Sequence, residues 1–341
     1  MGLVAVGVLM GPVGVASAAG VPVCTASVLA LPAGTPVGAQ SDVTKADDSG
    51  RFVVGRVWSG DDMRPVLWTD GVPRVLDDAP GVGPGVVDVN SSGVVIGSST
   101  AKDGTTLPWV FADGTYRVLE VPDYMNGTTG VAAINNRGDI VGSGMSNFTE
   151  DLASLVWPGG GKPRVLLTPE GQLSSATDIN DDGVVVGWSL IEEGGREREI
   201  SLRWKAWDQP GEYVYARNKN RGVVSEIRGN FSGGSEIFVD TGTFAGLVWD
   251  DLHGKFYPLP TTPESINDSG DAVTIDEQDG SQVVVAVNGT TRWKFPQRTR
   301  IATLPDRSPV TGPEPDAVGT IGAVGNNQAV LWHGCSDAII H

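Results

Sequence analysis

Carboxylate and amide side chains are the residues of this chain whose types and spacing could bind a metal ion. The segment 178–183 reads Asp-Ile-Asn-Asp-Asp-Gly, which matches the opening of an EF-hand calcium loop with Asp178, Asn180 and Asp182 as ligands. Such a loop also needs a glutamate at its far end, and none stands at that spacing. Another copy of the segment carries alanine and arginine at the ligand positions. We therefore expect a turn closed by Gly183, with no metal and no cofactor, and keep a calcium site as the alternative.

Paired carboxylates could also serve as a general acid and base in hydrolase or lyase chemistry. Glu192 and Glu193 lie in a long hydrophilic stretch that we predict to be a loop, and Asp61 and Asp62 follow another predicted strand. A solvated loop is the simpler interpretation of such acids. The chain has only three histidines, so a histidine metal cage or a Ser-His-Asp triad is poorly supplied.

Aromatic side chains in predicted loops could bind a ligand by stacking on sugar rings or by packing against a protein. The longest such loop is predicted at Gly229–Thr243, between a second and a third strand. The candidate ligand-binding residues are Phe231, Phe238, Phe244, Trp58, Trp188, Tyr124 and Phe148. The alternative for each of them is that it fills a gap between sheets.

A unit that recurs along the chain must position these residues. Its clearest copies are 176–187, 87–97 and 132–142, each with Ile-Asn or Val-Asn, a turn closed by glycine, and a β-branched run ending in glycine. A later strand of most units ends in an aromatic residue, and these stand 43 to 47 positions apart except for one gap of 83. They are Trp68, Phe111, Trp157, Trp204, Trp249 and Trp332. The wide gap holds two units, so we count seven copies.

Each unit reads as four short strands, and no stretch has sustained helical periodicity. A period of this length is typical of four-stranded propeller blades, and seven lies within the range of ~4–8 blades that close into a ring. We predict an all-β chain, a seven-bladed β-propeller with four-stranded blades, as a single domain over residues 19–341. Its second-to-third-strand loops differ in every unit and would open on one face, where recognition is expected. The nearly uniform first-to-second-strand turns are expected to be structural.

The two ends of the chain complement each other. Residues 1–18 are apolar and end in Ala-Ser-Ala, which predicts a signal peptide and a secreted protein. Ser27–Leu31 resembles a fourth strand without its other three, whereas the last unit lacks a fourth strand. The N-terminal strand is therefore predicted to complete the last blade and remove an open sheet edge. The only two cysteines, Cys24 and Cys335, flank this join and are predicted to form a disulfide, with two free thiols as the alternative.

The charge of the chain limits its partners. The formal net charge is −17, which argues against nucleic acid and against an anionic membrane surface. After residue 18 no apolar run is long enough to cross a membrane, so membrane insertion is not expected. We expect a monomer with a solvated surface.

The repeated segments resemble the extracellular HAF-repeat family. Its core pattern is Ile-Asn-x-x-Gly-x-Val-Val-Gly followed by an Ala-x-x-Trp strand. Ile179–Gly187 meets the first part, and Ala153–Trp157 resembles the second with one more residue between alanine and tryptophan. The His-Ala-Phe triplet that names the family is replaced by other residues in this chain. The resemblance implies a secreted bacterial repeat protein and carries over no catalytic residue. We expect a non-enzymatic propeller that recognises a glycan or an extracellular protein through its variable loops; the alternative is an extracellular hydrolase or lyase.

Overall fold

A computed structural model describes most of the chain. The described residues are 25–125, 127–146, 151–169, 173–193, 195–214, 221–237, 244–306, 315–323 and 326–335. The predicted signal peptide at residues 1–18, together with Cys24, Phe148 and Phe238, lies outside the described residues. No helix among the described residues is long and apolar enough to cross a membrane.

The described strands form seven antiparallel sheets of four strands each. Blade 1 contains β2 (Gln40–Ala46), β3 (Phe52–Ser59), β4 (Asp62–Thr69) and β5 (Val72–Val75), and blade 2 contains β6 (Val82–Val89), β7 (Val95–Thr100), β8 (Thr106–Ala112) and β9 (Thr115–Val118). Blade 3 contains β10 (Gly130–Ile134), β11 (Ile140–Met145), β12 (Leu152–Trp157) and β13 (Arg164–Val165). Blade 4 contains β14 (Ser174–Ile179), β15 (Val185–Glu193), β16 (Arg196–Trp204) and β17 (Glu212–Tyr213).

The remaining three blades follow the same strand order. Blade 5 contains β18 (Arg221–Arg228), β19 (Phe231–Ile237), β20 (Phe244–Asp250) and β21 (Lys255–Leu259). Blade 6 contains β22 (Ser265–Ile266), β23 (Ala272–Ile275), β24 (Gln282–Val285) and β25 (Thr291–Lys294). Blade 7 contains β26 (Thr299–Thr303), β27 (Ala317–Ala323), β28 (Asn326–His333) and β1 (Thr25–Val28). Two short 3-10 turns, η1 (Asp123–Met125) and η2 (Pro158–Gly160), lie outside the sheets.

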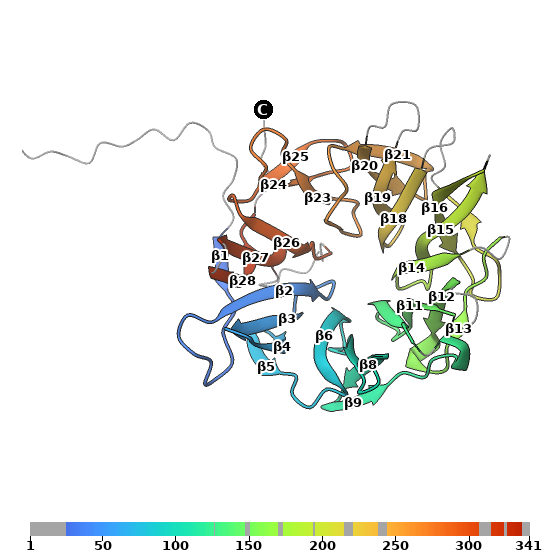
Figure 1. Cartoon of the computed structure of the whole chain (residues 1–341). Coiled ribbons are helices and arrows are strands. Elements are labelled where there is room, and N and C mark those ends of the chain that lie inside the picture. The colour runs from blue at the N-terminus through green and yellow to red at the C-terminus, as the bar shows by residue number, and fades with distance from the viewer. Residues whose placement is uncertain are drawn as a thin grey trace, which may run out of the picture.

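The ring closes by pairing the two ends of the chain. Strand β1 pairs with β28, with Thr25 opposite His333 and Val28 opposite Val330, and Figure 1 shows the blue β1 beside the red β28. This pairing confirms the seven-bladed propeller and its completion by an N-terminal strand, which begins two residues earlier than predicted. The first strand of each blade lies nearest the axis of the ring (Figure 1).

A glycine in the second strand of most blades shapes the first strand beside it. In blade 4 a Cβ at Gly187 would stand 2.1 Å from the carbonyl oxygen of Ser175, so the first strand can approach this closely only because Gly187 has no side chain. Next to this contact the register shifts between Ala176 and Asp178, which is a β-bulge. The same combination occurs at Gly55, Gly97, Gly142, Gly234 and Gly319. Blade 6 has Thr274 at this position and no register shift in its described pairing.

The third-strand tryptophans hold consecutive blades together. Trp68, Trp157 and Trp204 are 0% exposed. Their indole nitrogens donate to main-chain oxygens at the end of the preceding blade, those of Ala30, Glu120 and Leu167, over 2.6 to 2.7 Å. Each apolar core combines side chains of neighbouring blades, as where Val54 of blade 1 packs with Val95 and Trp109 of blade 2. The spacing of these aromatics therefore reports the spacing of the blades.

Two local predictions are wrong. Phe231 is not in a second-to-third-strand loop but begins β19, because β18 runs through Gly222 to Arg228 and the turn of blade 5 lies at Gly229. The unit there reads Ile-Arg-Gly in place of Ile-Asn-x-x-Gly, so the shorter turn escaped the pattern. Glu192 and Glu193 are also not in a loop, since β15 and β16 continue their pairing to Glu193 and Arg196.

Candidate functional site

The strand order gives the axis of the ring two chemically different ends. Each first strand runs toward the first-to-second-strand turn, so these uniform turns gather at one end, which we call the uniform-turn mouth. The second-to-third-strand loops and the links between blades gather at the other end, the variable-loop mouth. Each mouth has a cavity. The cavity at the uniform-turn mouth has a volume of about 160 Å³, and the cavity at the variable-loop mouth about 610 Å³.

The side chain that follows the bulge bonds the next blade. Asp88 accepts the Ile134 main-chain N–H over 3.0 Å, and Asp178 accepts the Ile227 N–H over 2.8 Å. The equivalent acceptors in blades 5, 6 and 7 are Glu226, Ser265 and Thr303, which take N–H donors of Ile266, Leu304 and Ala46 at 2.8 to 3.0 Å. Five blades thus place a polar acceptor at this position of the blade interface, four of them at a bulge beside a glycine and blade 6 without one. Blade 3 has Ala133 there and makes no such bond.

A second row of bonds runs through the asparagines of the repeat. Asn90 donates to the Asn135 carbonyl, Asn135 to that of Asn180, and Asn180 to that of Gly229, over 2.9 to 3.1 Å. The other amide oxygen closes the local turn, as where Asn180 Oδ1 accepts the Val184 N–H at 2.9 Å. Both ends of these side chains are therefore used in holding the ring together.

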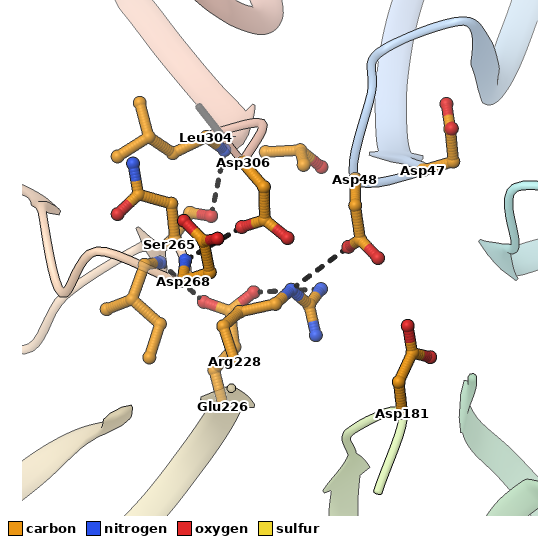
Figure 2. A network of polar contacts seen from close by, with 12 residues as sticks. Asp47, Asp48, Asp181, Glu226, Arg228, Ser265, Asp268, Leu304 and Asp306 are labelled. Carbon is orange, nitrogen blue, oxygen red and sulfur yellow. Dashed lines mark hydrogen bonds and ion pairs between the residues drawn. The ribbon is translucent and has the colours of Figure 1, made fainter. Parts of the chain in front are cut away.

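Five charged side chains meet near the axis and form what we call the inner charge cluster: Lys45, Asp88, Asp178, Glu226 and Arg228. Glu226 lies 2.7 Å from Lys45 and 3.3 Å from Arg228. Arg228 also lies 3.2 Å from Asp178. Its distance to Asp48 is 3.5 Å, and Figure 2 marks this ion pair. Lys45 lines the variable-loop cavity and Arg228 the uniform-turn cavity. The cluster therefore joins the two mouths through Glu226.

Burial and neighbouring charges move the pKa values of the cluster in opposite directions. Burial raises the pKa of Asp88 to about 7, although Lys45 and Arg228 act against it. Burial likewise raises the pKa of Asp178. Burial opposes ionisation of Glu226 too, but Lys45 and Arg228 outweigh it and lower the pKa of Glu226. Removing an ion from water is expensive, and only a close opposite charge offsets that cost.

Acidic side chains surround the cavity of the uniform-turn mouth. Asp48, Asp181, Asp268 and Asp306 line it, and Figure 2 shows them on separate turns around Arg228. Asp306 accepts the Asp268 N–H at 2.7 Å, and its own N–H donates to the Asp48 carbonyl at 2.7 Å. Burial raises the pKa of Asp306 to about 7, and the charge of Asp48 adds to this effect. Hydrogen bonds of these residues therefore connect one turn to another.

Asp178, Asn180 and Asp182, the residues that matched a calcium loop, lie at this mouth, and the oxygens of Asp178 and Asn180 accept hydrogen bonds. Asp178 accepts main-chain N–H groups of Ile179 and Ile227 and contacts Arg228. Asn180 Oδ1 accepts a main-chain N–H, whereas Asp182 is exposed. Donors and an arginine cation occupy the positions that a calcium ion would need, and this favours the turn interpretation. Among the residues described here, no group of three His, Cys, Asp or Glu side chains could hold a metal ion.

Basic side chains gather at the variable-loop mouth, which sequence reasoning did not single out. The cavity is lined by Lys45, Arg56, Arg298 and Arg300, with Asp42 and Glu264 as its acids. Four cations against two carboxylates give the lining a formal charge of +2, in a chain of net charge −17. A local signal was present, because Arg298 and Arg300 stand two positions apart at the start of an inner strand.

Two of these cations are already paired and two are not. Arg56 forms a bidentate pair with Asp42, at 2.5 and 3.1 Å, and Lys45 is held by Glu226. Arg298 and Arg300 are exposed and make no ion pair with any described residue. Arg298 has a φ of 66°, and every other described non-glycine residue with positive φ is an aspartate. This backbone is unfavourable for a long side chain.

The candidate aromatic residues do not gather around one point. Trp58, near the end of β3, lies opposite Met63, which lines the variable-loop cavity. Tyr124 is 40% exposed in a link between blades at the same mouth, and Trp188 is half-buried in β15. Phe231 begins β19 at the opposite mouth and packs against the core of blades 5 and 6.

The remaining aromatic and acidic candidates lie apart from each other. Phe244 is the first residue of β20, opposite Ile237. Asp61 lies in the tight loop of blade 1 and Asp62 begins β4; both are exposed, with Asp62 4.0 Å from Arg64. Glu192 lies opposite Glu197 near the tip of the blade 4 hairpin. These acids belong to different blades and line neither mouth cavity among the described residues.

Together, the sheets and their closure define a seven-bladed β-propeller with four-stranded blades, joined by a pairing of the two chain ends. No protein-family model and no curated protein matches the chain. Solved structures do. The oligogalacturonate lyase from Vibrio parahaemolyticus aligns with a TM-score of 0.57 at 9% identity, over 92% of this chain and 97% of that chain.

A second similar structure is the β-propeller domain of the Trilobed protease from Pyrococcus furiosus, with a TM-score of 0.57, 9% identity, and coverage of 88% of this chain and 97% of that chain. That domain is described as having an open velcro topology, whereas β1 closes the ring here. The chain spans 64% of TolB from Acinetobacter baumannii and 48% of a prolyl endopeptidase. Identities this low show the fold and nothing about activity.

Proposed function

We propose that this propeller is a non-enzymatic binding protein that binds a glycan at its variable-loop mouth. The observation that carries the proposal is the cavity of about 610 Å³ there, within the range of ~300–1,000 Å³ that is typical of small-molecule sites. Its lining is rich in charged and hydroxyl side chains and includes Thr44, Thr320 and Asn327. A concave polar cavity suits a hydroxyl-rich molecule better than a protein partner, which needs about 800 Å² of surface.

The proposal includes secretion, in keeping with the apolar leader at residues 1–18 and with the resemblance to extracellular HAF repeats. It also includes a disulfide between Cys24 and Cys335. Support comes from the register, because Thr25 lies opposite His333, two positions before Cys335, which is 6% exposed. Mass spectrometry of the exported, non-reduced chain measures both features, and two free thiols would refute the disulfide.

The test is glycan-array binding of the wild-type chain and of Thr44→Trp, which places a large side chain in the cavity. Thr44 lies at the bulge of blade 1 and lines the cavity. The matched control is Ala132→Trp, at the equivalent bulge of blade 3, which lines neither mouth cavity. We expect Thr44→Trp to abolish binding and Ala132→Trp to retain it.

Three results would contradict this proposal. A wild-type chain that binds no glycan has no such function, and equal loss of binding in both variants would remove the cavity from the account. Cleavage of the bound glycan, detected by mass spectrometry, would replace the binding function with the hydrolase or lyase alternative.

A further inference from the structure

The variable-loop cavity combines a net positive lining with two arginines that have no partner among the residues that the structure describes. A chain of net charge −17 repels most anions. A local surplus of positive charge at a concave site therefore favours anionic ligands at that site. Arg56 and Lys45 are engaged by Asp42 and Glu226 and cannot turn to a ligand without breaking those pairs. Only Arg298 and Arg300 have free guanidinium groups in the cavity lining.

From this arrangement we infer that the glycan is an acidic saccharide whose carboxylate is bound by Arg298 and Arg300. This inference rests on the proposed glycan-binding function and narrows its ligand class. A guanidinium group donates two parallel N–H bonds to a carboxylate, and such charge-assisted bonds are about twice as strong as neutral ones. The hydroxyl and amide groups of Thr44 and Asn327 remain as contacts for the sugar hydroxyls.

Backbone strain supports a role for Arg298 beyond solubility. A surface arginine needed only for charge could stand at any position with ordinary backbone angles. Arg298 instead occupies a positive φ of 66° in the turn that leads into β26, the innermost strand of blade 7, and its carbonyl accepts the Gly322 N–H at 3.3 Å. Backbone in this region is enriched where a chain clamps a ligand.

A variant of Glu264 should change the affinity for the acidic saccharide in the opposite direction to the arginine variants. Its exposed carboxylate lines the same cavity and makes no ion pair with any described residue. A negative group there repels an acidic ligand. Neutralising it should therefore strengthen binding of an acidic saccharide, while neutralising an arginine should weaken it.

The experiment is titration calorimetry at low salt with a uronic acid oligosaccharide and with the same oligosaccharide after methyl esterification of its carboxylates. We expect the wild-type chain to prefer the acid over the ester by tenfold or more, on the order of one charged hydrogen bond. Arg298→Gln and Arg300→Gln should each lower the affinity for the acid about tenfold and leave that for the ester unchanged. Glu264→Gln should raise the affinity for the acid.

The outcomes separate this inference from the proposed function. The inference would be overturned if the chain bound acid and ester equally, if Thr44→Trp abolished this binding, and if neither arginine variant changed it. The proposed glycan site would stand in that case. Binding of neither saccharide, and of no other glycan, would end both. A sulfated saccharide in a third arm identifies the acid group: preference for it over the uronate would overturn the carboxylate assignment. Circular dichroism of each variant confirms that it folds, as expected for substitution of exposed side chains.

Discussion

The two mouths of the ring use the same residue types in opposite ways. At the uniform-turn mouth the Arg228 side chain is only 12% exposed and has three acidic partners, Asp48, Asp178 and Glu226. At the variable-loop mouth Arg298 and Arg300 are exposed and have none among the described residues. The cavity is about 160 Å³ at the first mouth and about 610 Å³ at the second. The polar groups of the uniform-turn mouth are thus engaged by one another, while the variable-loop mouth leaves Arg298 and Arg300 available for a ligand.

This difference has a physical origin in the repeat itself. A side chain that recurs at equivalent positions always meets the same neighbour in the next blade, so it can be satisfied by a main-chain bond, as Asp88 and Asp178 are. A side chain present in one blade only, such as Arg298, has no such standing partner. Recognition is therefore expected at the loops that vary between blades, and cohesion at the uniform-turn end, where even the non-repeating Arg228 is paired with acids.

The largest expected effect comes from removing the cation of the uniform-turn mouth. Arg228→Ala leaves Asp178 and Glu226 buried with less positive charge near them, and breaking a buried ion pair costs about 3–5 kcal/mol. We expect the free energy of unfolding to fall by that order, measured by urea denaturation. Arg300→Ala is the control at the other mouth and should change it by less than about 0.5 kcal/mol.

Similar losses for the two arginine variants would contradict the distinction between a cohesive and a binding mouth. So would a loss below about 1 kcal/mol for Arg228→Ala, since a solvated surface pair is worth no more than that.

A smaller effect is expected from pH at the same mouth. The pKa of Asp306 is about 7 in the folded protein against an ordinary value of 3.8, so the folded state binds this proton more tightly. The free energy of unfolding should therefore fall as pH rises from about 4 to about 7, and Asp306→Asn should flatten this decline. Because Asp306 is only half-buried, we expect a gain on the order of 1 kcal/mol for the variant at pH 8.

Denaturation curves at pH 5 and pH 8 measure this difference. Asp208→Asn removes one charge from an exposed position outside both mouths and serves as the control for net charge. An equal gain in both variants would assign the effect to overall charge, and an unchanged slope in Asp306→Asn would remove Asp306 from the pH response.

The repeat predicted the architecture well because the same physical constraint acts in every blade. The third-strand tryptophans, the turn asparagines and the second-strand glycines each solve one recurring problem of blade packing, so their spacing predicted the blade count. The closure was predicted from the lone strand at one end of the chain and the missing fourth strand at the other. Blade 5 shows where this reasoning fails. Its turn residue is Arg228 and not asparagine, and the decoy at 218–222 matched the pattern better than the true turn at Gly229.

The site was predictable only in part. The variable-loop end was the expected place for recognition, and the cavity of about 610 Å³ lies there. Its charged lining was not expected, because Arg56, Glu264 and Arg300 come from three blades, and no local spacing relates them. The inner charge cluster was missed for a different reason: Lys45, Asp88 and Glu226 hold equivalent places in different copies, but they differ in type, so the repeat pattern did not group them.

The smallest expected effect sharpens the comparison at the variable-loop mouth, through a pair of variants that move stability in opposite directions. Arg298→Gly relieves a positive φ that costs a side-chain-bearing residue roughly 1–2 kcal/mol, partly offset by the entropy of glycine in the unfolded chain. We expect a net gain of up to about 1 kcal/mol in the free energy of unfolding. Arg300→Gly, inside β26 at ordinary backbone angles, should lose about 0.5–1 kcal/mol. If Arg298 stabilised the fold, the free energy of unfolding would fall in both variants. A rise in Arg298→Gly and a fall in Arg300→Gly, together with weaker binding of the acidic saccharide by both, mean that the strained backbone at Arg298 serves ligand binding.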